Sequence, residues 1–272
     1  MKPYSLWIPV RNEEATIEPL IISVLEQENP PENIYVCVNG SSDRTGEIVY
    51  EISQQCRQVI PLTSSPWKAN AWNTIVQTAV SDGTFEDVMV FCDGDISFGG
   101  PKTLSTLVQH TRASTNNIVG GSIFPVPSRN RIRPCKLCTP SGWLYCIQKT
   151  ILELLEKHSY WKMPNNIINE DLFLSLLAYP DVDVITDAFF YAVKPDLRDY
   201  IITQIRILKW MKQLVDMGMW AELEIWIDRV LQSWGVLRTL KYGYIVPLMM
   251  SMITVSPSDH VWTITSSTKK LV

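Results

Sequence analysis

Short apolar runs alternate with segments of helical periodicity through the first third of the chain. The apolar runs are typical of strands buried on both faces, and they lie at residues 4–10, 33–38, 57–62 and 87–91. Between them, apolar residues recur at helical spacing over 16–26, 41–55 and 68–80. Strands that alternate with helices predict an α/β fold, in which helices cover both faces of a mostly parallel sheet.

The helix expected over 41–55 has polar residues at its start. Ser41 or Ser42 is expected to accept hydrogen bonds from the free amides of the first turn. Asp43 suits the same turn, because a negative charge is favourable at a helix N-terminus.

Residues 196–255 follow a helical pattern with one apolar face, formed by Leu197, Ile201, Ile205, Leu208, Met211 and Val215. Four tryptophans and six basic residues lie nearby: Trp210, Trp220, Trp226, Trp234, Arg206, Lys209, Lys212, Arg229, Arg238 and Lys241. We expect a helical extension with one of three uses. It packs on the preceding domain, lies on an anionic membrane surface, or forms a homodimer interface.

Composition narrows the class of protein. With 272 residues, of which 46% are hydrophobic, the chain can form one large domain, or one domain with a small appendage. A net charge of -4 argues against nucleic acid as the main partner. The short apolar start is followed at once by Arg11, Glu13 and Glu14, so it does not resemble a signal peptide.

The remaining features also favour a cytoplasmic protein. The apolar stretch 242–255 is too short to span a bilayer and contains Pro247. Cys37 and Cys92 lie in apolar runs, where a reduced cysteine acts as a small hydrophobic residue. Cys135 and Cys138 form a lone C-x-x-C without a second ligand pair, so ordinary thiols are favoured over a zinc site.

A polar cluster follows each of the four expected strands: residues 11–14 (RNEE), 39–45 (NGSSDRT), 64–70 (SSPWKAN) and 93–95 (DGD). In a parallel sheet, the carboxyl ends of the strands lie at one edge, and ligands bind there. We therefore expect the four clusters to form one site.

Asp93 and Asp95 end the fourth apolar run on either side of Gly94. Two carboxylates this close repel each other unless a cation lies beside them, and oxygen ligands suit Mg²⁺ or Mn²⁺. A diphosphate on the substrate would complete the coordination shell. The alternative is a polar turn, in which both carboxylates accept from backbone amides around Gly94.

Five of these patterns together resemble a known family. The segments IPVRNEE, VCVNGSSDRT, WKANAWN, FCDGDISF and INEDLFLS occur in the order, and at about the spacing, seen in family-2 glycosyltransferases of the GT-A fold. The resemblance covers roughly residues 4–178. It implies a Rossmann-like GT-A domain over 1–195, with a nucleotide-sugar half over 1–98 and an acceptor half over 99–195. Residues 196–272 would form the helical extension.

The resemblance also implies roles for individual residues. Asp95 would bind the metal, and Asp93 would lie near both the metal and the ribose. Glu170 and Asp171 form the E-D pair of the last segment, and Asp171 would be the catalytic base. The nucleotide pocket would be lined by Pro9, Arg11, Glu13, Asn39 and Lys68. Ser141, Gly142 and Glu170 would lie near the donor sugar or the acceptor.

Two departures from the family pattern limit these implications. The family usually has aspartate at the position of Asn39, although asparagine can both donate to and accept from a base such as uracil. Residues 204–210 (QIRILKW) resemble the Q-x-x-R-W pattern of processive synthases, but with the wrong spacing. Some GT-A enzymes take a further metal ligand from a C-terminal loop, where His260 would be the candidate.

A purely structural role remains the alternative for three of these residues. Glu170 and Asp171 would favour a helix start whether or not they act in catalysis. Lys68 would be solvated if it only begins a helix.

The function expected is that of a metal-dependent, inverting glycosyltransferase that uses Mn²⁺ or Mg²⁺ and a nucleotide-diphosphate sugar, most simply a UDP-sugar. The acceptor is not identified by any motif. One rival is a non-catalytic protein that binds sugar nucleotides or acts as a scaffold. A sugar nucleotidyltransferase is disfavoured, because no glycine-rich loop follows the first strand.

Overall fold

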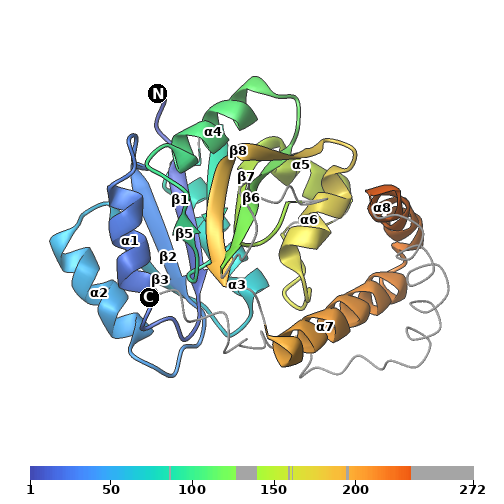
Figure 1. Ribbon diagram of the computed structural model, residues 1–272, viewed down its shortest axis with the longest axis horizontal. Helices are drawn as coiled ribbons and strands as arrows, with labels where there is room; N and C mark the ends of the chain where they lie inside the picture. Colours follow the sequence, from blue (N-terminus) through green and yellow to red (C-terminus); the bar gives the residue numbers. More distant parts are fainter. Residues whose placement is uncertain (86, 127–139, 159, 161, 194–195, 234–272) are drawn as a thin grey trace.

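The computed structural model describes residues 1–85, 87–126, 140–158, 160, 162–193 and 196–233. In this part of the chain, eight strands form one sheet in the order β3-β2-β1-β4-β7-β6-β8-β5 (Figure 1). The strands are β1 Ser5–Val10, β2 Asn33–Val38, β3 Val59–Thr63, β4 Val88–Cys92, β5 Ser97–Phe98, β6 Ile118–Val126, β7 Leu144–Gln148 and β8 Val182–Val193. The helices are α1 Ile17–Leu25, α2 Thr45–Gln55, α3 Lys68–Ser81, α4 Thr103–Ala113, α5 Thr150–Lys157, α6 Glu170–Ala178, α7 Leu197–Asp216 and α8 Trp220–Ser233.

The first four strands confirm the α/β prediction. β1 pairs in parallel with both β2 and β4, and β2 pairs in parallel with β3. Beyond β4 the sheet is mixed, since β7 is antiparallel to β4 and β6, whereas β8 is parallel to β6. The carboxyl ends of β1 to β4 therefore lie at one edge, as the sequence predicted.

Helices cover both faces of the sheet, and each face has its own apolar core. On one face, Trp7, Phe91 and Tyr145 pack with residues of α3, α5 and α6. Trp7 meets Phe91 edge-on and Phe91 stacks on Tyr145, with ring centroids 4.9 Å apart in both pairs. On the other face, Leu6 and Ile8 pack with the buried residues of α1 and α4. Burial on both faces explains why these strands are apolar throughout.

The helical extension packs on the first of these two cores. Trp210 and Met211 of α7 are buried in it, and the Trp210 ring meets Trp226 of α8 edge-on at 5.4 Å. Figure 1 shows α8 beside α6, and α7 runs below them. The predicted apolar face of α7 is thus buried only in its second half. Leu197, Ile201 and Ile205 in the first half are 75%, 49% and 41% exposed.

Three sequence features lie outside the described residues: the Cys135–Cys138 pair, His260, and the part of the extension from 234 to 255. Within the described ranges, every helix is too short or too polar to cross a bilayer.

Candidate functional site

Hydrogen bonds join the loop after β1 to the loop after β2. The Asn12 amide donates to Ser41 Oγ (3.1 Å), and Asn12 Oδ1 accepts from the Ser42 amide (2.8 Å). The Glu13 amide donates to Thr45 Oγ1 at 2.7 Å. Two of the four polar clusters are therefore held together, as the parallel topology predicted.

The start of α2 corrects one prediction. Asp43, rather than Ser41 or Ser42, accepts from the Thr45 amide, at 3.1 Å. Ser41 is instead used to bind the neighbouring loop. A serine near a helix start can serve either purpose, and the sequence alone does not distinguish them.

Glu13 packs against the D-G-D turn. The Glu13 side chain is buried, and its carboxylate accepts from Thr16 Oγ1 at 2.9 Å. A Cβ atom added to Gly94 would lie 3.0 Å from Glu13 Cγ and 3.0 Å from Val10 Cγ1. Glycine at this position thus allows the first and fourth polar clusters to approach each other closely.

Lys68 links the D-G-D turn to the E-D pair. The Lys68 ammonium lies 2.7 Å from Asp93 Oδ1 and 2.6 Å from Glu170 Oε1. The exposed fractions of the Lys68, Asp93 and Glu170 side chains are 14%, 13% and 5%. A solvated lysine at the start of α3 is therefore the wrong interpretation. Lys68 is a buried cation between carboxylates from two distant segments.

Proton affinities in this cluster are strongly shifted. Burial would lower the pKa of Lys68, but Asp93, Glu170 and Asp171 outweigh burial and raise it above the usual range. Burial raises the pKa of Asp93 to about 6, against the attraction of Lys68, and Asp95 adds to the rise. Burial also raises the pKa of Glu170, opposed by Lys68 and supported by Asp171 and Asp93.

The excess of carboxylates over ammonium groups in this cluster fits a divalent cation, because oxygen ligands and negative charge are what Mg²⁺ and Mn²⁺ require. In the described ranges, no three His, Cys, Asp or Glu side chains come together as a complete metal-binding group. One or two carboxylates suffice for Mg²⁺ when substrate phosphates supply further oxygens. Asp93 and Asp95 are two carboxylates that fit this requirement.

Asp171 faces the turn that precedes β7. Asp171 Oδ2 accepts from the Gly142 amide at 2.7 Å. A Cβ atom on Gly142 would lie 2.7 Å from Lys68 Nζ and 3.4 Å from Glu170 Oε1, so the glycine makes room for the charged cluster. The Trp143 carbonyl accepts from the Asp93 amide at 3.0 Å, which holds the turn beside β4.

The E-D pair occupies the first turn of α6, where negative charge is also favourable. A helix-starting role and a role in the site are therefore compatible. Ser141 lies in the same turn as Gly142, and its hydroxyl oxygen is buried. Gly142 thus lies beside Asp171 and Glu170, and Ser141 precedes it in the same turn.

Asn39 directly follows β2 and its side chain is fully buried, and the side-chain amide has no hydrogen-bond partner within the described residues. A buried amide without partners costs free energy, so a ligand that pairs with it would bind more tightly. The Asn39 backbone amide donates to the Val10 carbonyl at 3.0 Å, which holds Asn39 beside the end of β1. Pro9 and Arg11 flank Val10 at that edge.

The third polar cluster packs against the second at Gly40, and its backbone is strained at Trp67. Gly40 has a φ of 77°, and a Cβ atom there would lie 2.7 Å from Pro66 Cγ. Trp67, directly before Lys68, has a φ of 139°, which is strained for a residue with a bulky side chain. Such strain is concentrated at functional sites, and no sequence pattern indicated it here.

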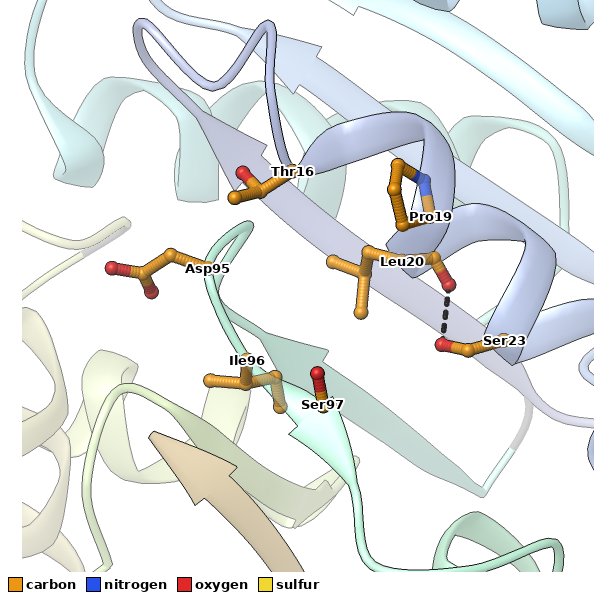
Figure 2. Close-up of a pocket in the computed structure, with 7 residues that line it drawn as sticks. All are labelled: Thr16, Pro19, Leu20, Ser23, Asp95, Ile96 and Ser97. Carbon is orange, nitrogen blue, oxygen red and sulfur yellow. Dashed lines mark hydrogen bonds between the residues drawn. The ribbon is translucent and has the colours of Figure 1, made fainter. Parts of the chain in front are cut away.

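Figure 2 shows a small pocket between α1 and the segment after the D-G-D turn. Its cavity volume is about 50 Å³, room for a few water molecules. The lining residues are Thr16, Pro19, Leu20, Ser23, Asp95, Ile96 and Ser97. The Asp95 carboxylate points away from Leu20 and Ile96 in Figure 2, and Asp95 is the residue of the D-G-D turn that lines this pocket.

Comparison with known proteins identifies the family. The model of glycosyl transferase family 2 matches residues 5–163. No curated protein matches the chain.

Several solved structures share the fold. Staphylococcus aureus TarS 1–349 in complex with UDP-GlcNAc has a TM-score of 0.55 and 19% identity, over 71% of this chain and 59% of that chain. The mannosyltransferase PcManGT from Pyrobaculum calidifontis, in complex with GDP-Man and Mn²⁺, has a TM-score of 0.60 and 17% identity. The match covers 94% of this chain and 84% of that chain. At such identities the likeness establishes the fold alone, and this chain spans less than two thirds of the TarS chain that binds UDP-GlcNAc. From the family match and the fold, the chain belongs to glycosyl transferase family 2 and has the GT-A fold of a glycosyltransferase.

Proposed function

We propose that this glycosyltransferase moves a sugar from a nucleotide-diphosphate donor to an acceptor, with a divalent cation and with inversion at the anomeric carbon. The convergence of Asp93, Glu170 and Asp171 around Lys68 carries the proposal. A donor-side turn and an acceptor-side carboxylate pair meet there, as transfer between two bound substrates requires.

The donor half of the proposal rests on Asn39. Its side-chain amide, which has no partner among the described residues, can donate to one group and accept from another. Uracil offers a carbonyl beside an N–H, so UDP-sugars are the first candidates. Guanine offers the same pair of groups, and the similar structures include one with UDP-GlcNAc and one with GDP-Man. Pro9, Arg11, Glu13 and Lys68 would line the rest of the nucleotide site.

Asp95 and Asp93 would hold Mn²⁺ or Mg²⁺. The cation would neutralise the charge that develops on the leaving diphosphate. The excess negative charge of the cluster supports this role, as does the Mn²⁺ in the PcManGT complex.

Asp171 would act as the base. Its Oδ2 atom is held by the Gly142 amide, which leaves Oδ1 to accept the proton of the acceptor hydroxyl. Deprotonation by one base and a single displacement invert the anomeric configuration. Lys68 would keep Glu170 and Asp93 in place, and Ser141, Gly142 and Glu170 would border the acceptor or the donor sugar.

We further propose a division at residue 195, with the catalytic domain before it and the helical extension from 196 to 272. The exposed residues Leu197, Ile201 and Ile205 support a contact surface on α7, either for an anionic membrane or for a second copy of the chain. Co-flotation with anionic vesicles would favour the membrane, and a dimer in light scattering would favour the second copy.

A thermal-shift panel tests the donor. UDP-glucose, UDP-GlcNAc and GDP-mannose would be compared with and without Mn²⁺, because a ligand of the native state raises the unfolding midpoint. We expect a Mn²⁺-dependent rise with at least one donor. The absence of a shift with every donor would contradict the proposal. Binding without turnover would favour the rival, a non-catalytic protein that binds sugar nucleotides.

A further inference from the structure

The segment from 163 to 169 leads directly into the E-D pair and has no regular secondary structure. Met163 and Ile167 anchor it in the apolar core, at 0% and 4% exposure. One turn is closed within it, where the Ile167 amide donates to the Pro164 carbonyl at 3.0 Å. The direction in which Glu170 and Asp171 leave this segment therefore depends on what binds its remaining peptide groups.

Gln213 of α7 binds two of those peptide groups. Its Nε2 atom donates to the Asn166 carbonyl at 2.6 Å, and its Oε1 atom accepts from the Ile168 amide at 3.1 Å. The Gln213 side chain is buried, so water does not readily replace it. One side chain of the helical extension thus fixes the backbone on both sides of Ile167, immediately before the E-D pair.

Asn73 of α3 binds the other end of the same segment. Its Nδ2 atom donates to the Met163 carbonyl at 2.8 Å and to Asn165 Oδ1 at 3.0 Å. α3 begins with Lys68, which pairs with Glu170. The segment and the carboxylates after it are therefore clamped between α3 and α7.

We propose that Gln213 is a positioning residue for Glu170 and Asp171. In this way α7 contributes to catalysis as well as to packing. Gln213 hydrogen-bonds to backbone groups of Asn166 and Ile168 and would not contact the reacting atoms. It acts through the backbone at 166–168, which sets where the Asp171 carboxylate meets the Gly142 amide. Misplacement of a catalytic group by a fraction of an ångström to 1 Å is enough to slow a reaction strongly. The effect on rate rests on the proposed function, whereas the effect on the backbone does not.

Gln213→Met tests the proposal, because methionine has a similar length and makes neither hydrogen bond. Met211→Ala is the matched control. Met211 is fully buried on the same helix, and its truncation costs core packing while leaving Gln213 in place. Full-length variants would be compared by donor hydrolysis with Mn²⁺, and by hydrogen exchange of the peptide that covers 163–171.

We expect Gln213→Met to lower kcat about 10-fold or more, with the KM for the donor within two-fold of the wild type. Exchange should accelerate within 163–171 more than in Met211→Ala. An unchanged kcat and unchanged exchange, or equal effects in Met211→Ala, would overturn the proposal. If Gln213→Met fails to fold, Gln213→Glu tests the bond to the Asn166 carbonyl alone, since it keeps the size and the acceptor for the Ile168 amide. If the wild type hydrolyses no donor, the proposed function fails, and the exchange measurement alone decides the positioning role.

Discussion

The Lys68 ammonium lies 2.6 Å from a carboxylate oxygen of Glu170, and this ion pair joins the start of α3 to the start of α6. Removal of the cation in Lys68→Met leaves Glu170 and Asp93 buried without their partner. Such a loss typically costs about 3–5 kcal/mol. Urea unfolding at pH 7 should show a decrease of that order in the free energy of unfolding.

Lys102→Met is the control for Lys68→Met. Lys102 pairs with Glu28 at 3.7 Å, and both side chains are more than half exposed. Exposed pairs contribute about 1 kcal/mol or less. Equal losses of unfolding free energy in the two variants would mean that burial does not increase the contribution of the Lys68 ion pairs to stability.

Asp171→Asn should lower kcat by about 10²-fold or more, which is the usual effect of losing a general base. Asparagine can still accept from the Gly142 amide, so the local structure should survive. Donor affinity, measured by titration with the nucleotide sugar and Mn²⁺, should change little. An equal loss of donor affinity would assign Asp171 to binding or to the metal.

Asn39→Ala should weaken UDP binding by about 1 kcal/mol or more, because the base loses its partner. The ligand-free variant should lose little stability, since the Asn39 amide is buried without a hydrogen bond in the described structure. Asn73→Ala gives the contrast. Asn73 is buried and hydrogen-bonded, so its removal should destabilise the ligand-free protein by about 1–3 kcal/mol. Unchanged UDP affinity in Asn39→Ala would remove Asn39 from the site.

A pH dependence follows from Asp87 and Arg112, outside the site. Burial raises the pKa of Asp87, but hydrogen bonds and charge attraction from Arg112 more than offset it, so the pKa lies below its usual 3.8. The folded state therefore binds the proton less tightly than the unfolded state. The resulting stability is complete well above pH 3.8 and is lost as the pH falls through the lower, folded-state pKa.

Asp87→Asn should reveal this contribution. We expect the variant to be up to about 1 kcal/mol less stable than the wild type at pH 7, the scale of a partly exposed ion pair. The difference should shrink as the pH falls below 3.8, measured by urea unfolding at each pH. A difference that stays constant down to the acid transition would mean that Asp87 acts through packing rather than charge.

The sheet edge that carries the site was predictable because the apolar runs can be read directly. The run at 33–38 coincides with β2 as observed, and the parallel order of β1 to β4 brings the loops that follow them together. Lys68 and Asp93 could thus be expected at one place. The ion pair of Lys68 with Glu170 required the structure, because the apolar pattern specifies neither the antiparallel pairing of β7 with β4 nor the place of α6 beside the site.

Two other features could not be read from periodicity. The spacing of Leu197, Ile201 and Ile205 predicted an apolar face on α7, but periodicity does not tell which part of that face a neighbour covers. Gln213 looks like an ordinary helix residue in sequence. Its role depends on the peptide groups of 166–168, which no pattern in α7 indicates.

Release of nucleoside diphosphate from a UDP-sugar tests the proposed reaction most directly. With Mn²⁺ present, the wild type should release UDP, and excess EDTA should abolish the release. Asp95→Ala should also abolish it and should remove the Mn²⁺-dependent part of nucleotide binding. Full activity in excess EDTA would contradict the metal-dependent mechanism, and no release from any UDP- or GDP-sugar with Mn²⁺ would contradict transfer from a nucleotide-diphosphate donor.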